Sequence, residues 1–384
     1  MTVLYYTQTY YLDAAIETIR SLDICNLELH LVIEITPDSK CSNIINIASL
    51  DNADAVTSFK SLIGEEATST FEPYFKALKS VQFLVFKKNK VISLDTIKTI
   101  YYFSKLMHKI KPSVIHFDTV TLRSLILSPL FFGLKRVITI HDPIPHLGAA
   151  SFKTKAIHFI NFTIANRFVF YSNYAKNQFE YHYYFLKQPR FVIQFQPYTY
   201  NQVFMKPVNQ LIEPYILFFG RISFYKGVDI LISTIPEILK IYPNQKFIIA
   251  GRSEGYTIDD QVIKKYKENI VFINRYINSS DLVKLIQYSK FLVCPYRDAS
   301  QSGVLMTALA IGKPVIATSV GAFPEYIQDG HNGLIAAPTS ESFLERVLYF
   351  LESNRFIEAT MNVDSSFSHS VAASNRNLLL QTYF

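Results

Sequence analysis

The sequence is poor in the residues that mark secreted, metal-binding and membrane-spanning proteins. Among 384 residues there are three cysteines, Cys25, Cys41 and Cys294, and no tryptophan. Three scattered cysteines are too few for a disulfide framework or a four-ligand zinc site, so they favour a reduced compartment. The start of the chain lacks the pattern of a signal peptide, and the longest apolar stretch, 125–134, is too short to span a bilayer. We therefore expect a cytoplasmic protein.

The remaining composition is that of a globular chain. Hydrophobic residues make up 49% of the sequence and charged residues 18%, which excludes a disordered or fibrous protein. At roughly 100 to 200 residues per domain, the length predicts two or three domains, each able to bury a core.

Short runs rich in β-branched and aromatic residues alternate with helical patterns along most of the chain. This alternation predicts parallel α/β layers. The predicted strands read TVLYY, LELHLVI, VQFLVF, SVIHF, RVITI, RFVFY and FVIQF in the first half, and YILFF, KFIIA, NIVFI, FLVCP, PVIAT and GLIAA in the second. We expect two doubly wound, Rossmann-like lobes of about six strands each. Their seam should lie within 198–214, where proline and amide residues replace the periodicity.

Basic charge is concentrated in the N-terminal half. The net charge is +7; residues 1–205 hold 21 Lys and Arg against 15 Asp and Glu, whereas residues 206–384 hold 17 against 16. Within 76–111 lysines alternate with aromatic residues, as expected of a surface that meets anionic lipid, a lipid-linked substrate or nucleic acid. The simpler interpretation is a solvated basic helix face. No zinc-finger spacing, RNA-binding aromatic motif or basic zipper accompanies the segment, so nucleic acid is the weakest of these partners.

Glycine placement indicates which lobe binds a ligand. Nine of the 12 glycines lie at Gly220 or later, and several follow predicted strands. Open α/β sheets bind ligands at that carboxyl edge, although structural turns explain part of the distribution. Neither G-x-G-x-x-G nor G-x-x-x-x-G-K-[ST] occurs, which disfavours a dinucleotide site and a P-loop.

Two segments of the second lobe have the composition of an anion site. In YILFFGRISFYKGVDIL a strand ends at Gly220, Arg221 follows, and Lys226 and Gly227 open a helix. Arg221 can fork onto two phosphate oxygens and Lys226 adds a compact charge, which suits a pyrophosphate; a solvated turn has the same pattern. In the other segment, residues 300–303 precede an apolar helix whose first N–H groups would face an anion.

These residues, followed by ALAIGKPVIATSVGAFPEYIQDGHNG, resemble the C-terminal donor domain of family 4 glycosyltransferases of the GT-B fold. The similarity is strong over roughly 215–352 and looser in the N-terminal lobe, through the opening strand, VIHFDT and TIHDPIPH. It implies two Rossmann-like domains facing across a cleft. The acceptor-binding domain would cover 1–200 and the nucleotide-sugar donor domain 201–365, with a final helix over 366–384 that packs back on the N-terminal domain.

The resemblance implies that Arg221 and Lys226 hold the donor pyrophosphate and stabilise the leaving nucleotide. Glycines and helix-start amides would complete this site, at Gly220, Gly227, Ser302, Gly303 and Val304. No D-x-D occurs in the sequence, which argues against a divalent cation carried by two carboxylates. Positive side chains and a helix end can stabilise the leaving group instead, so we expect no metal and no other cofactor.

One departure concerns the donor contacts. The family commonly has two glutamates separated by seven residues, and these positions read Ala299 and Thr307 here. The second glutamate usually binds the donor ribose, so Thr307 or Gln301 would make a weaker polar contact. Asp298 stands one residue from the first position. We interpret this pattern as a variant donor contact; loss of activity is the alternative.

Other candidate residues follow predicted strands. Base recognition in such folds comes from the loop after NIVFI, which makes Arg275 and Tyr276 candidates; an exposed loop pair is the alternative. Glu325 opens a short helix and either approaches the donor or stabilises the helix dipole. His141 and Asp142 end RVITI, where related enzymes place a histidine beside the transferred sugar; a structural histidine and a capping aspartate are the alternative.

We therefore predict a glycosyltransferase of the hexosyltransferase type that is retaining and metal-independent. It would move a sugar from a nucleotide-diphosphate sugar to a hydroxyl acceptor in polysaccharide, lipopolysaccharide or lipid-linked glycan synthesis. The expected partners are the nucleotide sugar, the glycan or lipid-linked acceptor and the surface of an anionic membrane, but no nucleic acid. Two alternatives stay open: a sugar-nucleotide epimerase or hydrolase of the same fold, which would need a carboxylate base, and a non-catalytic scaffold subunit.

Overall fold

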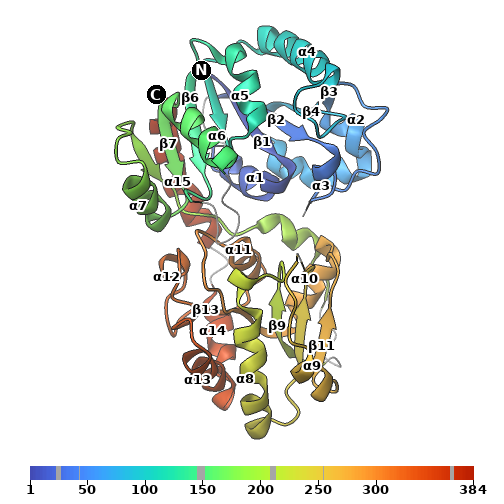
Figure 1. Ribbon diagram of the computed structural model, residues 1–384, viewed down its shortest axis with the longest axis vertical. Coiled ribbons are helices and arrows are strands. Elements are labelled where there is room, and N and C mark those ends of the chain that lie inside the picture. The colour runs from blue at the N-terminus through green and yellow to red at the C-terminus, as the bar shows by residue number, and fades with distance from the viewer. Residues whose placement is uncertain (23–26, 43, 145–151, 208–212, 254, 364–366) are drawn as a thin grey trace. The chain divides into compact units, whose positions relative to one another are not determined.

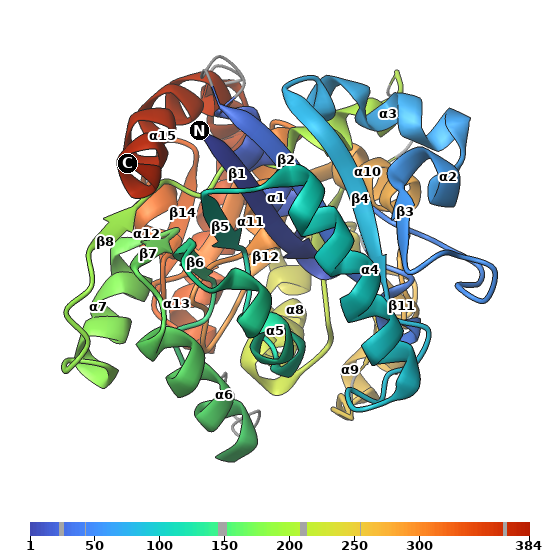
Figure 2. The same cartoon turned by 90° about the horizontal axis from the view of Figure 1, so that it is seen from above.

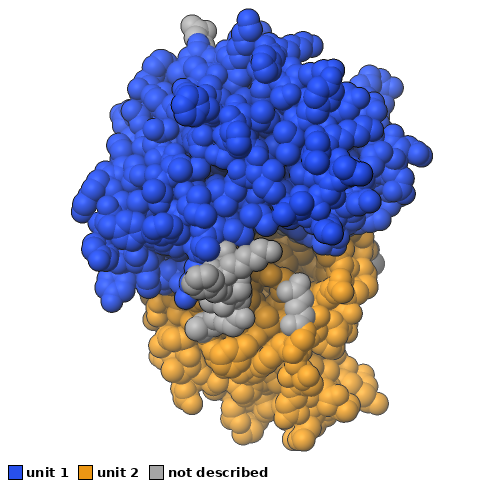
Figure 3. Space-filling model, turned by 45° about the horizontal axis from the view of Figure 1, so that its top comes forward, with its two compact units in different colours: residues 1–145, 149–196, 369–384 blue, residues 146–148, 197–368 orange. Residues whose placement is uncertain are grey.

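The computed structural model describes residues 1–384 except 23–26, 43, 145–151, 208–212, 254 and 364–366. The chain forms two compact units (Figure 3). Unit 1 contains residues 1–145, 149–196 and 369–384, and unit 2 contains residues 146–148 and 197–368. The sequence had placed these divisions at 200/201 and 365/366. Within the expected seam, Thr199–Phe204 forms a 3-10 helix of unit 2, and residues 208–212 lie outside the described residues.

Unit 1 is built on one eight-stranded sheet with the order β3-β4-β2-β1-β5-β6-β7-β8 (Figure 1). Its strands are β1 (Thr2–Gln8), β2 (Glu28–Ile35), β3 (Val56–Ser58), β4 (Leu78–Val85), β5 (Val114–Phe117), β6 (Lys135–Ile140), β7 (Arg167–Phe170) and β8 (Arg190–Val192). Its helices are α1 (Leu12–Arg20), α2 (Phe59–Ile63), α3 (Glu65–Phe75), α4 (Leu94–Ile110), α5 (Leu122–Leu127), α6 (Phe152–Thr163), α7 (Asn173–His182) and α15 (Phe367–Tyr383). Among the strands of unit 1 that the structure describes, the β3–β4 pair is antiparallel and the other pairs are parallel.

Four helices cover one face of this sheet. Phe103 of α4, Leu127 of α5, Phe162 of α6 and Phe179 of α7 are buried in one cluster with the strand residue Tyr6. Aromatic side chains dominate the cluster, so each helix buries a large apolar area against the strands. The β1 pattern, buried at every interior position, is that of a parallel strand covered on both faces.

The last helix of the chain completes unit 1. The Tyr383 hydroxyl and His116 Nδ1 lie 2.7 Å apart, and His116 Nε2 lies 2.7 Å from the Thr139 hydroxyl. Further along α15, the Asn375 side chain exchanges two hydrogen bonds of 2.7 Å with the backbone of Gln194. The chain therefore leaves unit 1, forms unit 2 and returns to unit 1 through α15.

Unit 2 is built on a six-stranded parallel sheet with the order β11-β10-β9-β12-β13-β14. Its strands are β9 (Tyr215–Phe219), β10 (Phe247–Ala250), β11 (Ile270–Ile273), β12 (Ser289–Cys294), β13 (Val315–Thr318) and β14 (Gly333–Ala336). Its helices are α8 (Val228–Ile241), α9 (Gln261–Lys265), α10 (Ser279–Tyr288), α11 (Gly303–Ala310), α12 (Phe323–Tyr326), α13 (Ser340–Leu351) and α14 (Phe356–Asn362). The carboxyl ends of the six strands share one edge, because all are parallel.

The predicted α/β class and two Rossmann-like sheets are confirmed. All thirteen predicted strands form, but unit 1 has eight strands where the sequence led us to expect about six. The strand that was not predicted is β3, whose three residues are only partly buried and show no usable periodicity. None of the helices in the described part of the chain combines the length and the apolar run needed to cross a bilayer.

Candidate functional site

The loop after β9 is pressed against neighbouring backbone at the carboxyl edge of the unit 2 sheet. Gly220 has a φ of 127°, and a Cβ built there would lie 3.4 Å from Val304 of α11. Gly227 has a φ of 62°, and its Cβ would lie 1.9 Å from the carbonyl oxygen of Pro295. A side chain at Gly227 would collide with the backbone that follows β12. Glycine therefore lets this loop lie in contact with both β12 and the start of α11.

The same loop carries two cations that differ in burial. Arg221 is exposed, and its Nη2 donates to the Tyr225 hydroxyl at 2.8 Å. Lys226 is only 9% exposed, and its Nζ lies 3.8 Å from the centre of the Tyr296 ring and 5.2 Å from that of Tyr225. An ammonium over an aromatic face retains electrostatic stabilisation where water is largely excluded. The loop thus presents one solvated and one largely desolvated positive charge.

The start of α11 adds hydrogen-bond donors beside these cations. Ser302 caps the helix, and its hydroxyl accepts a hydrogen bond from the N–H of Leu305 at 3.3 Å. Gly303 and Val304 form the first turn, whose N–H groups lie at the positive end of the helix dipole. Since Val304 is the neighbour of Gly220, the loop after β9 and this helix start form one site.

Thr307 stands at the second glutamate position. Its hydroxyl group donates a hydrogen bond within α11. It is buried and donates to the carbonyl oxygen of Gly303 at 2.8 Å. Ala299, at the first position, is also buried. Gln301 lies half-buried just before α11. A ribose contact by Thr307 or Gln301 stays a prediction.

Two residues that sequence reasoning missed hold the loop in place. Arg297, after β12, forms a two-pronged ion pair with Asp229 in the first turn of α8, at 2.8 and 2.6 Å. Its backbone N–H donates to the carbonyl oxygen of Tyr225 at 2.8 Å. Burial opposes ionisation of Asp229, but the hydrogen bonds and charge of Arg297 outweigh it and lower the pKa of the carboxyl. Arg297 therefore connects the two segments that converge at the site.

Three other predicted residues lie on the flanks of this site. Arg275 and Tyr276 follow β11, which is two strands away from β9 in the sheet. Arg275 pairs with Asp281 at 3.3 Å and donates to the carbonyl oxygen of Tyr276 at 3.1 Å. Glu325 lies on the exposed side of α12, after β13 on the other flank.

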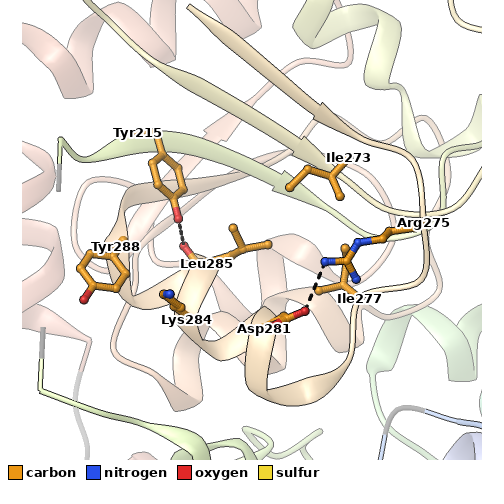
Figure 4. Close-up of a pocket in the computed structure, with 8 residues that line it drawn as sticks. All are labelled: Tyr215, Ile273, Arg275, Ile277, Asp281, Lys284, Leu285 and Tyr288. Atoms are coloured by element: carbon orange, nitrogen blue, oxygen red, sulfur yellow. Dashed lines mark hydrogen bonds and ion pairs between the residues drawn. The ribbon is translucent and has the colours of Figure 1, made fainter. Parts of the chain in front are cut away.

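Arg275 also borders a pocket of about 260 Å³ beside α10 (Figure 4). The pocket is lined mainly by apolar and aromatic side chains, namely Tyr215, Ile273, Arg275, Ile277, Asp281, Lys284, Leu285 and Tyr288. The Tyr215 hydroxyl is not a free donor there, because it donates to the carbonyl oxygen of Leu285 at 2.9 Å.

The remaining predicted pair, His141 and Asp142, belongs to unit 1. His141 is buried, with its ring centre 4.3 Å from that of Tyr11, and Asp142 is half-buried. His141 Nε2 lies 3.2 Å from Asp118, whose carboxylate also accepts from the hydroxyl of Thr7 at 2.8 Å. The carboxylate holds the histidine in the tautomer that carries hydrogen on Nε2.

Asp118 is a further residue that sequence reasoning missed. It is fully buried and follows β5, next to the strand that carries His141. The signal available in the sequence was a carboxylate directly after SVIHF. Adjacent parallel strands bring their carboxyl ends together, so the pairing could have been expected.

A second buried carboxyl group stands at the same edge of unit 1. Glu34 is the next-to-last residue of β2 and accepts from the Tyr6 hydroxyl at 2.6 Å and from Gln8 Nε2 at 2.8 Å. Burial raises the pKa of Glu34, although these hydrogen bonds and the charge of Arg123 oppose the shift. Within the described residues, no cluster of three or more His, Cys, Asp and Glu side chains has a geometry that could hold a metal ion.

The segment that carries this site resembles a known protein family. Residues 213–353 match the family described as Glycosyl transferases group 1. Unit 2 therefore contains a segment with the sequence pattern of the group 1 glycosyltransferases. The chain is 28% identical over 155 residues to the lipopolysaccharide core biosynthesis mannosyltransferase LpsB of Rhizobium meliloti, a match that covers 38% of this chain and 43% of that protein.

A longer match involves an uncharacterised glycosyltransferase of Methanocaldococcus jannaschii. It is 28% identical over 231 residues and covers 60% of this chain and 62% of that protein. The chain thus spans less than two thirds of the length of these curated relatives.

Solved structures match this chain over its whole length. Sucrose-phosphate synthase from Thermosynechococcus elongatus gives a TM-score of 0.66, and Anabaena HepE in complex with UDP-glucose gives 0.64. Both are 14% identical in sequence, and both matches cover 100% of this chain and 99% of the other. At this identity the likeness shows the fold, which is GT-B.

Proposed function

We propose that the protein is a glycosyltransferase that moves a sugar from a nucleoside-diphosphate sugar to a hydroxyl acceptor. The observation that carries the proposal is the convergence of Arg221, Lys226 and the start of α11 at the carboxyl edge of the unit 2 sheet. A diphosphate needs several fixed donors and positive charges close together, and this arrangement supplies them. The family match over residues 213–353 supports the same activity.

The chemistry assigned to these residues is stabilisation of the leaving diphosphate. As the bond between the sugar and the diphosphate breaks, negative charge grows on the diphosphate oxygens. Arg221, Lys226 and the first N–H groups of α11 would then bind the leaving group more strongly than the intact donor, which lowers the barrier. We propose that these groups replace a divalent cation, since the sequence has no D-x-D.

We further propose a retaining reaction in which the acceptor attacks from the face that the diphosphate leaves. The leaving diphosphate oxygen would accept the proton of the acceptor hydroxyl, so no enzyme nucleophile is needed. His141 would contact the transferred sugar, and its hydrogen bond with Asp118 would set its tautomer. Arg275 and Tyr276 are proposed to contact the nucleotide base.

The names of similar proteins support a glycan acceptor. LpsB is named a mannosyltransferase of lipopolysaccharide core biosynthesis, and HepE was solved with UDP and with UDP-glucose. For this protein we propose a uridine diphosphate sugar as donor and a growing surface glycan as acceptor.

The test begins with thermal unfolding in the presence of UDP, GDP, ADP, CMP and their sugar conjugates. A ligand of the folded state raises the melting temperature by mass action. We expect one nucleoside diphosphate to do so in the wild type and to do so far less in Arg221→Ala. Product analysis with the matching labelled sugar nucleotide should then show transfer only when a glycan acceptor is present.

Two outcomes would replace the proposal. Release or isomerisation of the sugar without any acceptor would indicate a hydrolase or epimerase of the same fold. Binding with no turnover over a broad acceptor panel would indicate a scaffold subunit.

A further inference from the structure

The outward face of α4 in unit 1 exposes large apolar side chains to solvent. Leu94 is 86% exposed, and Ile97, Tyr101 and Tyr102 are also exposed, as is Ile92 just before the helix. We call these five residues the α4 stripe. A soluble helix normally turns such side chains inward, and contiguous exposed apolar patches mark interaction sites.

The stripe lies directly opposite the side of α4 that packs on the sheet. Thr96, Thr99, Phe103 and Met107 are buried, which satisfies the packing of α4 in unit 1. The stripe residues Leu94, Ile97 and Tyr101 recur at three- and four-residue intervals and so share one side of the helix. Figure 2 shows α4 in the foreground with no other element drawn over it. Core packing therefore does not explain the apolar side chains of the stripe.

Lysines border the stripe on the same helix, in the segment before it and at the residue that ends it. The exposed ones are Lys88, Lys90, Lys98, Lys105, Lys109 and Lys111. Lys105 Nζ lies 4.3 Å from the centre of the Tyr101 ring. Asp95 is the one carboxylate within 87–111, and it accepts from the backbone N–H of Lys87 at 2.8 Å. None of the described carboxylates forms an ion pair with these six lysines.

The combination of positive charge and apolar side chains indicates which kind of partner binds the α4 stripe. A second copy of the chain, docked by a two-fold axis, would bring the lysines of one α4 against those of the other. A bilayer surface with anionic headgroups attracts the lysines and accepts the aliphatic side chains between its headgroups. Phosphates alone, as in nucleic acid, would leave Leu94 and Ile97 in water.

We propose that the α4 stripe and its bordering lysines dock unit 1 on the surface of an anionic membrane. The helix would lie in the plane of the interface, with Leu94, Ile97 and Tyr101 inserted among the headgroups. Lysine stems would extend along the apolar side chains while their ammonium groups meet lipid phosphates. The inference does not depend on the proposed transfer reaction.

The test is sedimentation of the full chain with vesicles of phosphatidylcholine alone and of equal parts phosphatidylcholine and phosphatidylglycerol. We expect at least ~tenfold stronger partition onto the anionic vesicles, weakened by added salt. Leu94→Ser with Ile97→Ser, and separately Lys88→Ser with Lys90→Ser, should each reduce this partition by about tenfold. Because these side chains are exposed, the variants should keep the wild-type melting temperature.

A matched control lies in unit 2, where the aliphatic side chains of Ile241 and Val271 are also more than half exposed. Ile241→Ser with Val271→Ser should leave vesicle binding unchanged. Equal partition onto both kinds of vesicle, or no loss in either α4 variant, would overturn the proposal. So would a Leu94→Ser, Ile97→Ser variant that changes only the oligomeric state in light scattering, or a Lys88→Ser, Lys90→Ser variant that changes only binding to single-stranded DNA.

Discussion

The two cations of the loop after β9 differ in burial, so their removal should have different consequences. Arg221 is exposed, and Arg221→Ala should change the free energy of unfolding by less than about 0.5 kcal/mol. The same variant should lower kcat by about 100- to 1000-fold, the usual cost of one lost donor to a developing charge. Lys226→Ala should lower both kcat and stability, because it also removes the contact with Tyr296. Urea unfolding and initial rates measure the two effects.

The control for these variants is Lys240→Ala, which removes an exposed ion pair with Glu237 on α8. It should alter neither quantity measurably. Wild-type turnover in Arg221→Ala would contradict the assignment of the diphosphate to this loop.

Arg297 acts on the site through the loop it braces. Arg297→Lys keeps the charge but loses the planar fork that grips both Asp229 oxygens. We expect a cost of about 1 kcal/mol in stability and a larger rise in KM for the donor than fall in kcat. Steady-state kinetics would show this split. Arg346→Lys, which loosens an ion pair with Asp329 elsewhere in unit 2, serves as the matched control. If the two substitutions changed stability and the KM for the donor equally, the Arg297–Asp229 pair would have no specific role in positioning the site.

Sequence reasoning could find some of these residues and not others. Arg221 and Lys226 lie in one short segment after a strand, so their spacing alone suggested an anion site. Arg297 and Asp229 lie far apart in the chain, and only the contact between the loop after β12 and the start of α8 pairs them. Likewise, the buried position of Lys226 over Tyr296 depends on packing that no local pattern encodes.

At the scale of elements, strands with continuous apolar runs were predictable and β3 was not. A parallel strand buried on both faces, such as β9, needs apolar residues at every position, and YILFF has them. β3 lies at the sheet edge and pairs only with β4. Because an edge strand can be short and partly polar, its sequence does not differ from that of a loop.

The contact between β5 and α15 should make unit 1 sensitive to acid. Burial lowers the pKa of His116 from 6.5 to about 4, with Asp118 opposing and His141 assisting the shift. At this histidine the unfolded chain therefore binds more protons than the folded one between these values, so the contribution of His116 to stability is constant above about pH 6.5 and falls toward pH 4. The loss should approach about 3 kcal/mol at most. Urea unfolding measured from pH 4 to pH 8 gives this profile.

His116→Gln provides the comparison, because the amide retains a donor and an acceptor for Tyr383 and Thr139 but does not titrate. The difference in unfolding free energy between wild type and variant should shrink as the pH falls from 6.5 to 4. A difference that stays constant over this range would show that His116 does not titrate as described.

For the whole molecule, two lobes were predictable because the α/β pattern repeats on either side of a non-periodic seam. The sequence of α15 gave less indication of where this helix packs. Its packing on unit 1 came from a resemblance and not from periodicity, since the contacts that hold α15 join residues far apart in the sequence. Examples are His116 with Tyr383 and Gln194 with Asn375.

Because α15 packs on unit 1, removal of the C-terminal residues should destabilise unit 1 more than unit 2. Leu379 and Tyr383 are fully buried in unit 1, and losing each such side chain costs about 2–5 kcal/mol. Deleting residues 369–384 should therefore abolish hydrogen-exchange protection in β5 to β8, while β9 to β14 keep theirs. Phe384→Ala, which removes only an exposed ring, should leave both patterns intact. Equal loss of protection in the two units on deletion would contradict this prediction and would mean that they unfold as one cooperative body.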